Sequence, residues 1–342
     1  MITLSILSEV RMRTEATLLL NRSAVETLLS LTECIDAVEN IFRLQGEGRI
    51  PAPGILGVKT PSGGLHVKAG LLPRNRPYIV AKLNTNFPQN SEMFGLSTIQ
   101  GVIAVFDANN GAPLALLDSI EITIKRTAAA SAVAAKYLAR KNSRVATICG
   151  CGRQAEAQLR ALGVVLPLEK IFAFDLNQRV ARDFAAKFSK DCKIDIELVR
   201  DLSKAIRNSD AIVTCTPSRK FFVRSEDVKP GTFIAAIGAD AEEKQEIDPA
   251  LMASAKVVAD SLEQSCTIGD THHAIAKGLL RKEDVYAELG EIVAGKKPGR
   301  TNGDEIVIFD STGVAIEDAV AAAVVYEKAI ARKIDNHFSF AA

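Results

Sequence analysis

Tryptophan is absent from the 342-residue chain, and aromatic residues make up only 5% of it. So few aromatic side chains argue against the stacking platforms that bind single-stranded nucleic acids. Neither sign of charge is in excess, since 42 lysines and arginines balance 41 acidic residues to a net charge of +1. Because nucleic-acid binding needs a basic excess or patch, we expect no nucleic-acid partner.

Long apolar runs are lacking as well. No stretch approaches the ~20 apolar residues that a membrane helix needs, so we expect no membrane partner. Glu9, Arg11 and Arg13 interrupt any apolar core in residues 1–15, which argues against a signal peptide there. The six cysteines include no C-x-x-C pair and no metal-ligand spacing, and His272 and His273 have no third partner. We therefore predict reduced cysteines, no bound metal and a cytoplasmic protein.

The apolar pattern divides the chain into two kinds of sequence. Short apolar runs separated by Pro, Gly and Asn predict a mostly antiparallel sheet with strands over 64–69, 78–83, 101–107 and 114–118. From residue 122 an alanine-rich helix precedes alternating strands and helices, which is typical of a doubly wound parallel sheet. A strand over 305–309 and a helix over 315–331 follow, and the pattern alone leaves open which domain they join.

The strongest single feature is a G-x-G-x-x-A sequence at Gly150, Gly152 and Ala155, between an apolar strand (144–149) and a helix (154–162). Gly150 permits a tight turn, Gly152 allows the backbone to approach a pyrophosphate, and Ala155 allows close packing of the helix on the strand. The free N–H groups and the dipole of the helix start favour phosphate. This sequence predicts a dinucleotide-binding turn.

Asp175 ends the second strand, about 20 residues beyond Ala155. A carboxylate there accepts hydrogen bonds from a ribose 2′-hydroxyl and repels a 2′-phosphate. The sequence therefore favours NAD as the cofactor, with NADP as the alternative because Arg179 lies nearby.

Asp240 comes just past the end of a predicted parallel strand over 232–238. Ligands of such sheets bind at the carboxyl ends of the strands, so this carboxyl group is a candidate for proton transfer. A helix-capping or solvated aspartate is the alternative.

Three basic residues are further candidates. Lys68 shares a strand face with His66, and Lys82 shares one with Asn84. Such lysines bind a carboxylate or polarise a C=O or C=N bond, although exposed lysines lying along the surface fit equally well. Arg126 begins the alanine-rich helix, where it either grips a carboxylate or pyrophosphate in a bidentate pair or lies exposed on the helix.

With these residues assembled, the chain resembles the ornithine cyclodeaminase/mu-crystallin family over about residues 17–331. Several long motifs match in the same order. They are residues 81–90, 95–98, 126–130, 139–143, the Gly150 turn, 214–220, 236–240 with Lys244, and 309–313.

The resemblance implies an α/β fold with a Rossmann-type doubly wound parallel sheet and a second α+β domain. Residues 1–125 with 305–342 would form a discontinuous substrate-binding and dimerisation domain, and residues 126–304 the NAD-binding domain. It also implies a homodimer. Members include cyclodeaminases, alanine dehydrogenases and ketimine reductases, which share hydride transfer at an α-carbon bonded to nitrogen and next to a carboxylate.

Site residues follow from the same resemblance. It implies Asp240 as the catalytic acid/base and Lys82 as the lysine that polarises the substrate. The residues expected on the cofactor side are Thr98, Gly150, Gly152, Arg153, Gln154, Asp175, Thr216, Ile237, Gly238, Lys244 and Ser311.

Two departures from the cyclodeaminase pattern bear on the substrate. His66 stands where a cyclodeaminase has a glutamate that helps to hold the diamine, and Pro53-Gly54 occupies the stretch where an arginine binds the carboxylate, a role that Lys68 could take. A cationic pocket of His66, Lys68, Lys82 and Arg126 suits an anionic keto or imino acid better than a diamine.

These residues predict an NAD(P)-dependent imino acid reductase or amino acid dehydrogenase acting on a small substrate. One alternative is an ornithine cyclodeaminase, an ammonia-lyase with tightly bound NAD. The other is a non-catalytic binding protein like mu-crystallin.

Overall fold

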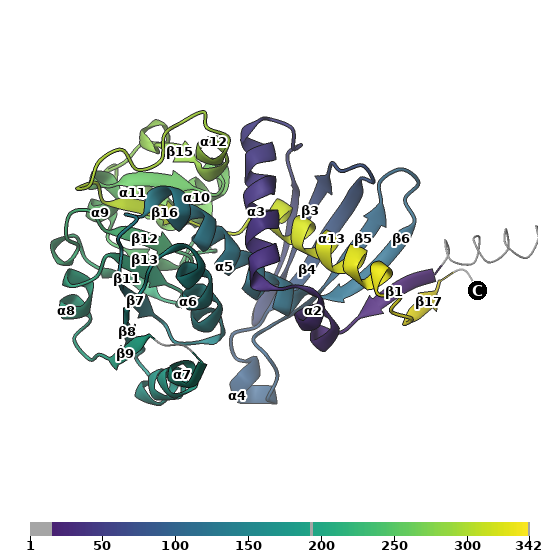
Figure 1. Cartoon of the computed structure of the whole chain (residues 1–342), viewed down its shortest axis with the longest axis horizontal. Helices are drawn as coiled ribbons and strands as arrows, with labels where there is room; N and C mark the ends of the chain where they lie inside the picture. The colour runs from purple at the N-terminus through teal and green to yellow at the C-terminus, as the bar shows by residue number, and fades with distance from the viewer. Residues whose placement is uncertain (1–15, 192–193, 341–342) are drawn as a thin grey trace, which may run out of the picture. The chain divides into compact units, whose positions relative to one another are not determined.

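The computed structural model describes residues 16–191 and 194–340. The chain divides into two compact units (Figure 1). Unit 1 contains the described residues up to 37, residues 48–126 and those from 314 onward, and unit 2 contains residues 38–47 and 127–313. Helices α3 (Leu31–Gly46) and α5 (Ser119–Leu138) each run from one unit into the other.

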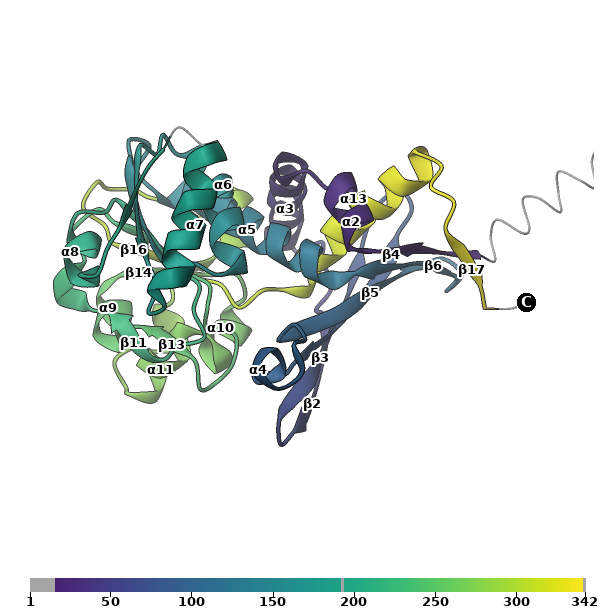
Figure 2. The ribbon, with the colours of Figure 1, turned by 90° about the horizontal axis from the view of Figure 1, so that it is seen from below.

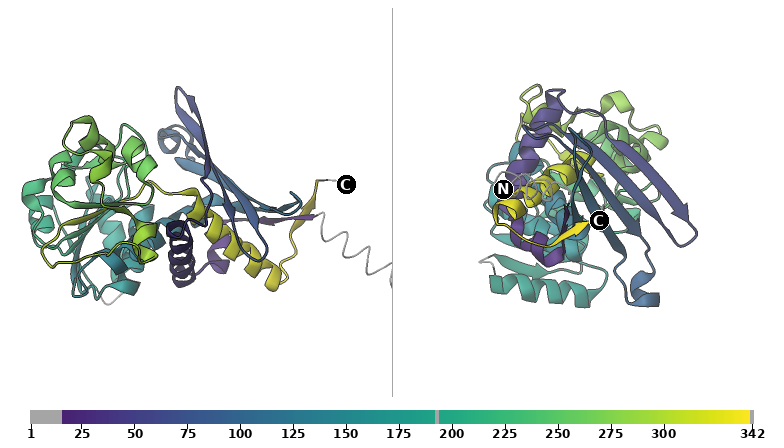
Figure 3. Two further views of the ribbon diagram at one scale, coloured as in Figure 1. Left: turned by 90° about the horizontal axis from the view of Figure 1, so that it is seen from above. Right: turned by 90° about the vertical axis from the view of Figure 1, so that its right-hand side faces the viewer.

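Unit 1 is built on a seven-stranded sheet. Its strands, in spatial order, are β17 (His337–Ser339), β1 (Ala16–Leu20), β6 (Pro113–Asp118), β5 (Ile99–Asp107), β4 (Tyr78–Asn86), β3 (Gly63–Leu72) and β2 (Gly54–Thr60). All neighbours are antiparallel except β1 and β6, so the predicted mostly antiparallel sheet is confirmed. Strands β1 and β17, from the two ends of the described chain, pair at one edge (Figure 3).

Helix α13 (Ala315–Ala331) covers one face of this sheet. It packs against β3, β4 and β5, on the same side as α2 (Arg22–Leu28) (Figure 2). The helix is rich in alanine and valine and is buried over most of its length, which is typical of a helix enclosed by a core. Glu317 and Asp318 in its first turn are buried too. The short α4 (Asn90–Phe94) lies between β4 and β5 in the chain.

Unit 2 is built on an eight-stranded sheet in which every pair is parallel. Its order is β15 (Ala287–Glu288), β14 (Lys256–Ala259), β16 (Val307–Asp310), β12 (Phe233–Ala236), β10 (Ala211–Thr214), β7 (Val145–Cys149), β8 (Lys170–Phe174) and β9 (Asp195–Leu198). A small parallel pair, β11 (Arg219–Val223) and β13 (Gln245–Ile247), accompanies it. The predicted doubly wound parallel sheet is confirmed.

The helices of unit 2 are mostly short. They are α6 (Arg153–Val165), α7 (Gln178–Asp191), α8 (Leu202–Arg207), α9 (Pro249–Ser254), α10 (Leu262–Ile268), α11 (Asp270–Ala276) and α12 (Leu289–Val293). In the described ranges, no helix combines the length and apolarity needed to cross a bilayer.

The strand order fixes where a ligand of unit 2 would bind. From β7 the chain moves outward through β8 and β9, then returns to place β10 on the other side of β7. Such a reversal opens a crevice at the carboxyl ends of the two central strands. The Gly150 turn follows β7, and Thr216 follows β10, so both lie at this switch point.

Strand β16 is the last strand of unit 2 before the chain passes into unit 1. Its four residues are fully buried, and it lies between β12 and β14. A short, buried strand of this kind, apolar apart from Asp310 at its end, suits the centre of a parallel sheet. Unit 2 ends at Gly313 and unit 1 resumes at Val314, and residues 38–47 lie in unit 2.

Candidate functional site

The turn after β7 is shaped by the protein itself. Gly150 has φ +91°, and a Cβ there would lie 2.8 Å from Thr216 Cγ2 and 3.0 Å from the Cys215 carbonyl oxygen. Its N–H donates to the Phe174 carbonyl at 2.9 Å, which ties the turn to β8. Both the backbone conformation and the packing therefore require glycine at this position.

Gly152 is different. Its φ is −77°, which any residue adopts, and beyond its chain neighbours no atom of the described residues lies within 4 Å of an added Cβ. Gly152 is also the N-cap of α6, and no side chain caps the free N–H groups of that helix. Glycine is a common N-cap residue, but no contact among the described residues requires it here, whereas the close approach of a bound phosphate group does. The residues present thus fit a dinucleotide.

The first two residues of α6 add polar groups to the same helix start. Arg153 is exposed. The side-chain oxygen of Gln154 is buried without a hydrogen-bond partner among the described residues. Sequence reasoning assigned both residues to the cofactor side.

Asp175 follows β8 and lies beside the turn. Its Oδ2 accepts a hydrogen bond from the Cys151 N–H at 2.9 Å, and its Oδ1 accepts one from the Asn177 N–H at 2.8 Å. Each carboxylate oxygen keeps acceptor capacity for a ligand hydroxyl. Arg179 is exposed and lies 3.9 Å from Asp183 on its own helix, an arrangement that does not single it out as a 2′-phosphate ligand.

A fully buried glutamate that sequence reasoning missed joins the ends of β10 and β12. Glu246 of β13 accepts from the Thr216 N–H at 2.7 Å, the Thr216 hydroxyl at 2.6 Å and the Gly238 N–H at 2.9 Å. Burial raises the pKa of Glu246, and these three donors oppose the shift. The expected cofactor residues Thr216 and Gly238 are therefore held by one carboxyl group. Ile237, between β12 and Gly238, donates its N–H to Thr214.

Asp240 lies past the end of β12 and is half-exposed. Its Oδ1 is 2.5 Å from Lys244 Nζ. The carbonyl of Lys244 is in turn 2.8 Å from His273 Nε2. The structure thus brings Asp240 and Lys244 together as an ion pair within unit 2.

Ser311 follows β16 and is buried, with its hydroxyl directed to Asp260. The Ser311 hydroxyl donates to Asp260 Oδ2 at 3.1 Å, and the Gly313 N–H donates to the same oxygen at 2.6 Å. Asp260 therefore fixes the segment that carries Ser311 at the carboxyl end of the sheet.

In unit 1, Lys82 lies in a buried group of alternating charges. Lys82 Nζ is 2.5 Å from Asp318 Oδ2, and Asp318 Oδ1 accepts from Arg126 Nε at 2.9 Å. Glu317 Oε2 accepts from Arg126 Nη1 at 2.8 Å. All four side chains are buried. We call this set, Lys82, Asp318, Arg126 and Glu317, the charge cluster.

The charge cluster perturbs its own members. Burial lowers the pKa of Lys82 to about 8, with Asp318 opposing the shift and Arg126 and Lys68 adding to it. Lys68 of β3 lies directly opposite Lys82 in the strand register. Burial raises the pKa of Glu317. Burial also acts to raise the pKa of Asp318, but Arg126 and Lys82 outweigh it and hold that pKa below its usual value.

The two acids of the charge cluster were missed by sequence reasoning, which expected cations alone at this place. Arg126 is neither exposed nor alone, because Glu317 and Asp318 enclose it. His66 is exposed on β3, opposite Asn84. The signal in the sequence was two adjacent acids within an otherwise apolar helix, but nothing in it indicated their partners.

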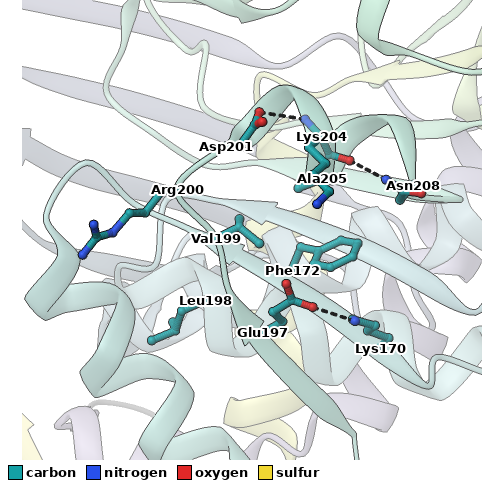
Figure 4. Close-up of a pocket in the computed structure, with 10 residues that line it drawn as sticks. All are labelled: Lys170, Phe172, Glu197, Leu198, Val199, Arg200, Asp201, Lys204, Ala205 and Asn208. Atoms are coloured by element: carbon teal, nitrogen blue, oxygen red, sulfur yellow. Dashed lines mark hydrogen bonds and ion pairs between the residues drawn. The ribbon is translucent and has the colours of Figure 1, made fainter.

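Other predicted residues lie outside these groups. Thr98 lies in unit 1, just before β5, and its carbonyl accepts from the Phe87 N–H at 2.9 Å. His272 and His273 stack their rings at 4.5 Å, and the described residues contain no cluster of His, Cys, Asp or Glu that could hold a metal. A cavity of about 450 Å³ lies along β8, β9 and α8, with Phe172, Glu197 and Lys204 among its lining residues (Figure 4). It contains none of the predicted site residues.

The chain is similar to known proteins in both sequence and fold. A model of the ornithine cyclodeaminase/mu-crystallin family matches residues 15–333. An alanine dehydrogenase of Archaeoglobus fulgidus is 40% identical over 324 residues, which cover 95% of this chain and 98% of that protein.

Two solved structures are similar over nearly the whole chain. An archaeal alanine dehydrogenase dimer with bound NAD has a TM-score of 0.91 and 39% identity, covering 95% of this chain and 99% of the other. The Δ1-pyrroline-2-carboxylate reductase of Thermococcus litoralis, in complex with NADH and L-proline, has a TM-score of 0.88 and 36% identity, covering 93% and 98%.

The contrast between the two glycines gives a stability prediction. We expect Gly150→Ala to lower the free energy of unfolding by at least about 1–2 kcal/mol, because φ +91° and the contact with Thr216 both penalise a Cβ. Gly152→Ala should lower it by less, by no more than about 1 kcal/mol, which is the cost of alanine at an N-cap. Urea unfolding of the two variants checks this, and equal destabilisation by both would show that the protein itself also requires Gly152.

Proposed function

Because the chain belongs to the ornithine cyclodeaminase/mu-crystallin family, we propose that it is an NAD-dependent oxidoreductase acting on the C–N bond of a small α-imino or α-amino acid. One observation carries this proposal. The chain combines a glycine turn, in which no contact among the described residues requires Gly152, with a buried Lys82 whose pKa is lowered by burial to about 8.

The cofactor half of the proposal rests on unit 2. The free N–H groups at the start of α6, with Arg153 and Gln154, would hold the pyrophosphate. Asp175 would accept from the ribose hydroxyls and select NAD over NADP. The segments after β10, β12 and β16 would line the rest of the cofactor site. They carry Thr216, Gly238 and Ser311. When bound, NADH supplies the hydride.

The substrate half rests on Lys82 and Asp240. In the reductive direction the α-carbon of an imino acid accepts a hydride, and the electron pair of the C=N bond moves to nitrogen. The Asp240 side chain, which is half-exposed, relays a proton from water to that nitrogen, and the product is the amino acid. The Lys82 ammonium donates a hydrogen bond to the substrate. It stabilises the negative charge that develops on the substrate as the hydride is transferred. In the reverse direction Asp240 takes the proton back.

An assay panel tests the proposal. The purified protein is mixed with NADH or NADPH and with pyruvate plus ammonia, pyruvate plus methylamine, or pyrroline-2-carboxylate. Net loss of the near-ultraviolet absorbance of NADH supports the proposal. Release of ammonia from ornithine without any net absorbance change would identify a cyclodeaminase instead. Tight binding of these ligands with no turnover would identify a binding protein.

Asp240→Asn should abolish most turnover. We expect kcat to fall by about 10²–10⁴-fold, because the amide cannot transfer a proton, while the Kd for NADH stays within about twofold. Steady-state kinetics and NADH fluorescence titration measure the two quantities. Glu243→Gln, which neutralises an exposed acid three residues away, is the matched control and should leave both unchanged. Full activity in Asp240→Asn would remove this residue from the mechanism.

Gly152→Ala should separate cofactor binding from folding. Because the added methyl group meets no atom of the described residues but would meet the pyrophosphate, we expect NADH affinity to fall by about tenfold or more while the protein stays folded. Fluorescence titration of NADH measures the change. Native affinity in this variant would contradict the proposed position of the pyrophosphate.

The partner we propose is a second copy of this chain. It would bind the face of the unit 1 sheet that points away from the Lys82 side chain. Leu56, Val67, Leu83 and Val102 lie side by side on that face of β2 to β5, and Leu56 is 57% and Val102 46% exposed. Strand β2 is exposed along its whole length. Apolar faces and bare edges of this kind mark interfaces, and the similar archaeal alanine dehydrogenase is described as a dimer.

Val102→Glu should therefore yield a monomer, because it places a second charge beside Asp118 on this otherwise apolar face. Light scattering coupled to size-exclusion chromatography measures the mass. Val164→Glu, which alters an exposed valine of α6 in unit 2, is the matched control and should keep the native mass. A dimeric Val102→Glu variant would show that the interface lies elsewhere.

A cytoplasmic location is part of the proposal. The five described cysteines, at positions 34, 149, 151, 215 and 266, are all free. Free thiols fit a reducing compartment.

A further inference from the structure

The two acids of the charge cluster have different partners although they are neighbours in the first turn of α13. Asp318 uses both oxygens, one 2.5 Å from Lys82 Nζ and the other 2.9 Å from Arg126 Nε. Glu317 accepts from Arg126 Nη1 at 2.8 Å. Of the two acids, Asp318 is thus the one that contacts Lys82.

We propose that Asp318 is a positioning residue for the reaction: it fixes the direction of the Lys82 side chain and keeps it as an ammonium ion, while Glu317 holds Arg126. This inference rests on the proposed function, in which the Lys82 ammonium donates to the substrate.

The charges around Lys82 show why a carboxylate is needed there. Strand β3 places Lys68 directly opposite it, and α5 contributes Arg126, so two cations face the amine. Strand β5 places the uncharged Ile103 opposite Lys82. His66 lies two residues from Lys68 and is exposed. The acids that face this group come from α13, and of these Asp318 is in contact with Lys82.

Burial, Lys68 and Arg126 all favour loss of the Lys82 proton, and Asp318 opposes them. Asp318 itself stays ionised, because Arg126 and Lys82 hold its pKa below the usual value and the positive end of the α13 dipole favours a carboxylate in the first turn. Without Asp318, the neutral amine would also be free to take other rotamers.

The pH profile of the reductive reaction tests the inference. Because an ammonium donor is needed, kcat/KM should fall as pH rises through the pKa of Lys82, near 8 in the native protein. Asp318→Asn removes the group that raises this pKa, so the alkaline limb should move to lower pH by about one unit or more. Glu317→Gln is the matched control, since it neutralises the adjacent acid, and its limb should stay near that of the native protein.

A second measurement does not depend on activity. The side-chain nitrogen of Lys82 is followed by NMR in protein labelled with 15N-lysine, without substrate, and is assigned by its loss in Lys82→Met. Its titration should move to lower pH in Asp318→Asn but not in Glu317→Gln. An unchanged titration in Asp318→Asn, or an equal shift in both variants, would overturn the inference. Absence of turnover in the native protein would instead overturn the proposed function, and the NMR result would still stand.

Asp318→Glu covers the case in which the amide variant does not fold. It keeps the charge but moves the carboxylate, so we expect the native alkaline limb with a lower kcat and an unchanged Kd for NADH. A native kcat in this variant would contradict the positioning role.

Discussion

A lysine ammonium buried beside two other cations requires a fixed carboxylate, and this requirement shapes unit 1. The acid that contacts Lys82 lies on the last long helix, whereas Lys82 lies on a strand near the start of the chain. Helix α13 must therefore return to the sheet formed by the first part of the chain. Removing one member of such a buried set leaves an uncompensated charge, so the discontinuous unit and the charge cluster depend on each other.

Unit 2 shows two kinds of constraint at one turn. Gly150 is required by its own backbone conformation and by its contact with Thr216, whereas Gly152 has open space around it. Close by, the buried Glu246 holds the segments after β10 and β12 through Thr216 and Gly238. The protein therefore fixes the loops at the switch point before any ligand binds, which reduces the ordering that binding must impose.

Local patterns predicted much of the fold. The helix at Ala315–Ala331 has the expected bounds, and the strand predicted over 144–149 differs by one residue from β7, because burial and helix periodicity leave a direct trace in such segments. Strand β2 was not predicted, since an edge strand exposed on every residue carries no alternation. The neighbours of β16 could not be predicted either, because an apolar run looks the same in any sheet.

In the candidate sites, too, the sequence predicted local features but not contacts between distant segments. The alternation along β4 predicted that Lys82 and Asn84 share a face, and the glycine spacing predicted the turn at Gly150. The partners of Lys82 and Arg126 come from Glu317 and Asp318, far along the chain, and only the folded structure brings them together. Glu246 was missed for the same reason, since its hydrogen bonds join segments that are separate in the sequence.

Isotope transfer tests most directly whether a hydride passes from NADH to the α-carbon of an imino acid. NADH dideuterated at C4 of the nicotinamide is incubated with the protein and pyrroline-2-carboxylate, and the product is analysed by mass spectrometry. We expect one deuterium atom at the α-carbon of the resulting amino acid for each NADH oxidised. Product without deuterium, or oxidation of NADH without any amino acid formed, would contradict it.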